Sequence, residues 1–235
     1  MNKTILMAAV AVVALTGAAN AGGAHQLKAG VSGHFSQHRL FHTPKGAKTL
    51  YDQTGNDSGS ANTSQNFESS FDQYDNQGAD DFTVPKGHTW TVSEVDVTGQ
   101  YRYSGGSADT ANVFFYKDKK GAPNKKALAE CDDVSTNDSG ATGSFALSLG
   151  KCAPSLAAGT YWVSVQANLD FSNPAEQWYW GTTTGALGAP AVWQDPNGGW
   201  TALGIPADCT KYKPLSYCLA GVGDWLFAVK GKDKK

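Results

Sequence analysis

Apolar and polar residues alternate in several short segments of the chain, and glycine, proline, asparagine or aspartate separates one segment from the next. In "GSFALSL", Phe145, Leu147 and Leu149 would share one face of an extended strand, because successive residues of a strand point to opposite faces. Alternation of this kind, or a composition that favours strands, predicts four further strands within residues 88–97, 111–117, 159–167 and 224–231.

One of these segments, "HTWTVSEVDV", changes phase in its middle. Val92 would face one side of the strand, whereas Val95 and Val97 would face the other. Because one extra residue returns a strand to its original face, the pattern predicts a β-bulge near Ser93-Glu94.

The whole pattern is typical of an all-β protein. No window has the repeat of a long amphipathic helix, and short strands separated by glycine-rich turns favour an antiparallel β-sandwich or jelly roll. We expect residues 49–235 to form it as a single domain. Residues 51–81 are crowded with Asn, Asp, Ser and Gly, which predicts an irregular segment with one short strand.

The first residues predict export. Residues 1–21 combine Lys3 with an apolar run from Ile5 to Leu15 and end in Ala-Asn-Ala, as in a secretory signal peptide cleaved after Ala21. The run is too short to span a bilayer. The chain is therefore expected to be secreted, to the extracellular space or the periplasm.

Charge is distributed unevenly behind the signal peptide. Residues 22–48 have little hydrophobic periodicity and several glycines, and no acidic residue occurs from Gly22 to Leu50. This predicts a loosely ordered, solvated basic extension at the N-terminus. The formal net charge of the whole chain is −2, which gives no reason to expect nucleic acid or an anionic membrane as partner.

Export makes disulfide bonds permissible, and the chain has four cysteines. Of the three possible pairings we favour Cys131 with Cys152 and Cys209 with Cys218, because each closes a local loop. No C-x-x-C spacing occurs, which argues against a zinc knuckle or a thioredoxin-like redox site.

Two stretches, "ADDFTVPKGHTW" and "AVWQDPNGGW" followed later by "DWLFAVKG", resemble a group of uncharacterised secreted bacterial domains. The resemblance runs from about Tyr51 to Gly231, with one departure where Asn197 stands between the proline and the glycine. It implies secretion and a β-sandwich, and it carries no assigned chemistry.

Catalytic motifs are missing from the sequence. It has no G-x-S-x-G, no H-E-x-x-H and no phosphate-binding loop, so we expect a protein that is not an enzyme. His34, His38 and His42 have the spacing of one helix face and could bind Zn²⁺ or Cu²⁺, but nearby glycines and Pro44 disfavour a helix there.

Asp80 and Asp81 stand where a polar loop gives way to a strand. We expect no cofactor, although carboxylates gathered in such a loop suit a structural calcium ion. The alternative, which we prefer, is that these side chains accept hydrogen bonds from turn amides.

Seven tryptophans suggest a binding surface, because sugar rings stack on indole faces. Trp90, Trp162 and Trp225 lie in alternating strands and are expected in the core. In "EQWYWGTTTG" we expect Tyr179 to point inward and the two neighbouring tryptophans to face solvent. The predicted ligand-binding residues are Trp178, Trp180, Trp193, Trp200, Gln194 and Asp195.

The favoured function is a secreted, non-catalytic β-sandwich that binds carbohydrate or another extracellular polymer through these C-terminal aromatic loops. A structural or protein-interaction module at the cell surface or in the extracellular matrix is the alternative, and an enzyme ranks third.

Overall fold

The computed structural model describes residues 46–102, 106–138, 142–171, 177–221 and 223–235. The expected signal peptide, residues 22–45 of the expected extension and the three spaced histidines lie outside the described residues. The strands are β1 Lys48–Asp52, β2 Asp57–Thr63, β3 Gln65–Asn66, β4 Gln77–Val97, β5 Gly99–Tyr101, β6 Thr110–Lys117, β7 Ala129–Ser135, β8 Phe145–Ser148, β9 Ser155–Asn168, β10 Trp178–Thr183, β11 Val192–Gln194, β12 Lys213–Pro214 and β13 Phe227–Lys234. The helical elements are η1 Ser69–Tyr74, η2 Gly150–Cys152, η4 Gly199–Leu203, η5 Ala207–Thr210 and α1 Leu215–Cys218.

The strands form two packed sheets, so the predicted all-β sandwich is confirmed. Within the described residues, a ten-stranded sheet has the central order β1-β13-β4-β9-β6-β7, and a three-stranded sheet has the order β2-β10-β5. Pairing is antiparallel except between β3 and β9. No helix of the described residues has the length and apolar character needed to cross a membrane.

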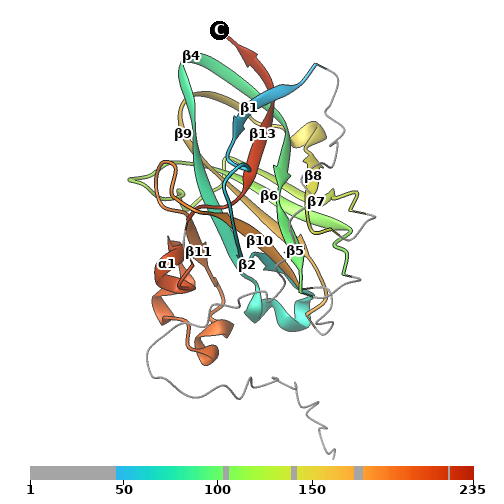
Figure 1. Ribbon diagram of the computed structural model, residues 1–235, viewed down its shortest axis with the longest axis vertical. Coiled ribbons are helices and arrows are strands. Elements are labelled where there is room, and N and C mark those ends of the chain that lie inside the picture. The colour runs from blue at the N-terminus through green and yellow to red at the C-terminus, as the bar shows by residue number, and fades with distance from the viewer. Residues whose placement is uncertain (1–45, 103–105, 139–141, 172–176, 222) are drawn as a thin grey trace, which may run out of the picture.

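Strand β4 organises the large sheet and runs along most of the molecule's length in Figure 1. Its first part pairs with β11 and β9, and its second part pairs with β13 and β8. The register against β13 passes from Glu94 directly to Val92, which leaves Ser93 as the extra residue. The predicted bulge is thereby confirmed, and it brings Val92, Val95 and Val97 together in the core.

The core lies between the two sheets and extends along β4, β9 and β13. Trp90, Trp162 and Trp225 are all buried, as the alternation in their strands predicted. Trp162 belongs to a smaller cluster with Tyr116 on the other side of the large sheet.

The two expected disulfides are present. Cys131 joins Cys152, which ties β7 to η2, and Cys209 joins Cys218, which ties η5 to α1. Both bonds are consistent with an oxidising extracellular or periplasmic compartment.

The polar segment at 51–81 is more regular than its composition predicted. It contains β2, β3 and η1, and β4 begins inside it at Gln77. Strand β2 forms because its backbone pairs with β10, where Ala61 is opposite Gly181 and Thr63 is opposite Tyr179. Pairing with a neighbouring strand determines the structure of this segment, and no local pattern of apolar residues predicts strand β2.

Candidate binding surface

The orientation predicted for β10 is wrong. Trp178 and Trp180 are fully buried, and Tyr179 is the half-buried residue on the opposite face. The indole of Trp180 stacks on that of Trp225, with centroids 5.1 Å apart, and Trp178 lies 5.3 Å from the ring of Phe145. Because two indoles remove more apolar surface from water than one phenol does, the sandwich buries the tryptophan face.

Glycines on neighbouring strands make room for the buried indoles. A methyl group added at Gly99 would lie 2.7 Å from Nε1 of Trp178, and one at Gly78 would lie 2.6 Å from the ring of Trp225. The indole N–H groups also find acceptors, since Trp178 donates to the Gly143 carbonyl at 2.8 Å and Trp180 to the Leu226 carbonyl at 2.8 Å. These residues are therefore core, and the open platform expected of them does not exist.

Trp193 is buried as well, and this also corrects the prediction. It donates its indole N–H to the Thr63 carbonyl at 2.9 Å. Its neighbour Gln194 is half-buried and donates to the side-chain oxygen of Gln77 at 2.7 Å. Asp195 is buried and accepts from the backbone amides of Gly198 and Trp200, so it caps the turn at η4.

Of the four tryptophans predicted to bind a ligand, Trp200 alone is partly exposed. Its ring stands edge-on to Tyr74, with centroids 6.3 Å apart, and its indole N–H donates to the Tyr74 carbonyl at 2.7 Å. Phe171 stacks on Tyr74 at 4.5 Å and on Phe71 at 4.7 Å. We call these four partly exposed rings, Phe71, Tyr74, Phe171 and Trp200, the aromatic surface cluster.

Two short helical turns hold the aromatic surface cluster together. Turn η1 supplies Phe71 and Tyr74, and η4 supplies Trp200. Gly199 permits the close approach, since a methyl group there would lie 2.2 Å from the Gln73 carbonyl oxygen.

Polar groups surround the aromatic surface cluster. Asn197 and Asp72 are exposed, and the Asn197 amide donates to the Asp72 carbonyl at 2.7 Å. Gln73 is exposed beside them. Burial raises the pKa of Asp75 to about 6, an effect that Asp72 and Asp195 strengthen although the Phe67 amide donates to Asp75. Flat apolar rings bordered by amides and carboxylates offer a ligand both apolar contact and hydrogen bonds.

Sequence reasoning found Trp200, with Asp195 beside it, and missed the other three rings of the aromatic surface cluster. Phe71 and Tyr74 are three residues apart in "SSFDQYD", a spacing that places two side chains on one face of a helical turn. That signal was available, but nothing in the sequence joins this turn to Phe171 or Trp200.

Asp80 and Asp81 accept hydrogen bonds from backbone amides, which is the alternative that we preferred from the sequence. Asp80 is fully buried and accepts from the Trp225 amide at 2.8 Å, from the Asp81 amide at 2.9 Å and from the Gln53 side chain at 2.7 Å. Asp81 accepts from the Ala189 amide at 2.8 Å. In the part of the chain that the structure describes, no three His, Cys, Asp or Glu side chains gather to hold a metal ion.

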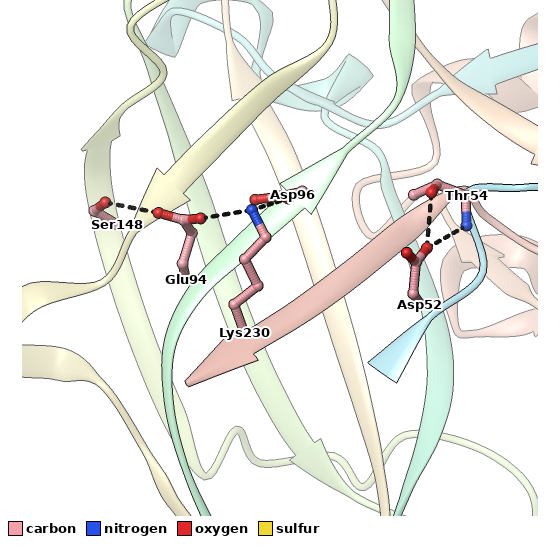
Figure 2. A network of polar contacts seen from close by, with 6 residues as sticks. All are labelled: Asp52, Thr54, Glu94, Asp96, Ser148 and Lys230. Atoms are coloured by element: carbon pink, nitrogen blue, oxygen red, sulfur yellow. Dashed lines mark hydrogen bonds and ion pairs between the residues drawn. The ribbon is translucent and has the colours of Figure 1, made fainter. Parts of the chain in front are cut away.

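A second polar cluster lies on the side of β4 away from the core (Figure 2). Lys230 places Nζ 2.9 Å from Glu94 Oε1 and 2.5 Å from Asp96 Oδ2, and Ser148 contacts the other Glu94 oxygen at 3.4 Å. Burial raises the pKa of Asp96 even with Lys230 beside it. One ammonium group offsets two buried carboxylates here, so removing Lys230 alone would leave both carboxylates buried without a cation.

The geometry alone defines the structural class of this protein. It is a disulfide-bonded β-sandwich with an aromatic surface cluster at one end. No family model and no curated protein matches the sequence, so the resemblance to secreted bacterial domains stays a prediction.

Proposed function

We propose that this protein is secreted and binds carbohydrate, as part of an extracellular polymer, through the aromatic surface cluster without catalysing a reaction. The observation that carries the proposal is the partial exposure of four rings in mutual contact, beside exposed amide and carboxylate side chains. Sugar rings offer C–H faces to such rings and hydroxyl groups to such polar neighbours.

The proposed binding residues differ from the set predicted from the sequence, because the predicted tryptophans on β10 and β11 are buried. Trp200 is retained from the sequence prediction, and Tyr74, Phe71 and Phe171 replace Trp178, Trp180 and Trp193. Export is supported by the signal-like residues 1–21 and by two disulfides that suit an oxidising compartment.

A glycan array followed by titration with the best polysaccharide tests the proposal. Trp200→Ala and Tyr74→Ala should each weaken polysaccharide binding by about tenfold, since residues central to an interface cost about that much when truncated. Trp200→Phe, which keeps a ring, should lose less.

Tyr217→Ala is the matched control, because Tyr217 is 51% exposed and lies outside the aromatic surface cluster. It should bind like the unchanged protein. Equal affinity of Trp200→Ala and Tyr217→Ala, with both folded by circular dichroism, would exclude the aromatic surface cluster as the binding site. Absence of any bound glycan, together with capture of a defined surface protein, would favour the interaction module instead.

A further inference from the structure

An open cavity of about 310 Å³ lies on the rim of the sandwich, apart from the aromatic surface cluster. Strand β1, strand β4 and the loop after β10 form its walls. The residues that line this cavity include Tyr51, Asp52, Asp81, Phe82, Leu187 and Gly188. Two of these side chains are carboxylates and two are aromatic rings.

Asp81 lines this cavity, which we call the rim pocket. The residue is only 5% exposed, and its Oδ1 accepts the Ala189 amide at 2.8 Å. Gly188 lies against the carboxylate, since a methyl group there would lie 2.6 Å from Oδ1 and 2.8 Å from Oδ2. The carboxylate therefore borders the space that Gly188 leaves open.

Further carboxyl groups lie near the rim pocket. Asp52 is exposed at its edge and uses Oδ1 to accept from the amide and hydroxyl of Thr54, as Figure 2 shows. Burial raises the pKa of Tyr51, and four carboxylates, those of Asp80, Asp81, Asp224 and Asp52, raise it further. A cation entering the pocket would reduce the repulsion among these groups.

The aromatic rings supply a second contact for a cation. Tyr51 is half-buried, and its hydroxyl donates to the Gln53 side chain at 2.5 Å, which fixes the ring at the pocket wall. The ring of Phe82 lies 6.1 Å from it. Cations bind aromatic faces within about 6 Å of the ring centroid, and ammonium ligands are recognised in this way.

A bare metal ion fits the rim pocket poorly. Calcium takes about six to eight oxygen ligands. Asp80 has already committed both carboxylate oxygens to protein donors, and Asp81 has committed one. An organic cation needs fewer oxygens and gains from the rings and from Leu187, which is 45% exposed.

We propose that the rim pocket binds an alkylammonium group, with the ammonium between Asp81 and Asp52 and the alkyl chain along Tyr51 and Leu187. The group could be carried by a free diamine or by a lysine side chain of a partner protein, which share this chemistry. This site is independent of the proposed carbohydrate surface.

Titration of the full chain with 1,5-diaminopentane, followed by nuclear magnetic resonance, tests the site. The Ala189 amide and the Leu187 methyl groups should shift as the diamine binds. Asp81→Asn keeps an acceptor for the Ala189 amide and removes the charge, so it should weaken binding by about tenfold or more. Tyr51→Leu should weaken binding as well, and Tyr51→Phe should weaken it less because the ring remains.

Asp132→Asn is the matched control, because Asp132 is an exposed carboxylate on β7, at the opposite end of the sheet order from β1. It should bind the diamine unchanged. A parallel titration with acetyl-lysine methylamide separates the two sources: tighter binding than the diamine indicates a lysine-bearing partner, and weaker binding indicates a free diamine. The proposal is overturned by no shift at Ala189 and Leu187, by equal loss in Asp81→Asn and Asp132→Asn, or by calcium displacing the diamine at equal concentration.

Discussion

At the scale of single residues, two tryptophan side chains differ in how completely the fold buries them. Trp180 is enclosed by Trp225 and Phe227, and its N–H is satisfied by a backbone carbonyl. Trp200 satisfies its N–H in the same way, but its ring is partly exposed. Burial, and not residue type, therefore separates the core tryptophan Trp180 from Trp200, which we propose to bind carbohydrate.

This difference gives a stability prediction. Trp180→Ala should lower the free energy of unfolding by about 3 to 5 kcal/mol, the cost of deleting a large buried aromatic side chain. Trp200→Ala should cost clearly less, because less of its surface leaves water on folding. Urea denaturation of both variants measures the difference. An equal loss in both would mean that Trp200 is also core, and the carbohydrate proposal would lose its central residue.

At the scale of elements, the two disulfides close loops of different length. The Cys131–Cys152 bond spans 21 residues and the Cys209–Cys218 bond spans 9. A longer closed loop removes more entropy from the unfolded chain in the chain-entropy model.

Replacing each pair separately by alanine should therefore destabilise the protein unequally. We expect a loss of about 3 kcal/mol for Cys131 with Cys152 and about 2.5 kcal/mol for Cys209 with Cys218. Thermal unfolding of the two double variants checks the order. A larger loss for the shorter loop would show that local packing around α1, and not loop entropy, determines the stabilisation.

At the scale of the whole molecule, buried carboxylates set the dependence of stability on pH. Burial raises the pKa of Asp75 and of Asp81 to about 6, above the value of 3.8 that applies to the unfolded chain. Burial also raises the pKa of Asp80, Asp195 and Asp224. Each of these groups binds its proton more tightly in the folded state, so its contribution to stability is present below pH 3.8. For Asp75 and Asp81 that contribution is lost as pH rises through about 6.

The free energy of unfolding should consequently fall as pH rises from about 4 to about 6. Urea denaturation across that range measures it, and the variant carrying Asp75→Asn and Asp81→Asn should show a weaker dependence. Asp233 acts in the opposite direction, because His88 and Lys48 lower its pKa, but its contribution is lost only below pH 3.8. Stability that rises steadily from pH 4 to 6 would contradict the raised pKa values.

Several features of this protein follow from the sequence alone. A period of two residues is enough to predict strands, and the phase change at Ser93 is enough to predict the bulge, because both depend only on neighbouring residues of one strand. Cysteine spacing likewise gave the correct pairing, since each bond joins residues close along the chain.

Only the tertiary structure decided which face of β10 is buried and which aromatic rings remain partly exposed. Alternation defines two faces of a strand but does not say which of them meets the second sheet, so the orientation of Trp178 and Trp180 depended on Trp225, Phe145 and the space left by glycines on other strands. The aromatic surface cluster joins rings from positions 71, 74, 171 and 200, and the rim pocket joins β1, β4 and the loop after β10. Contacts between such distant positions arise from the packing of whole elements, which no local pattern of residues encodes.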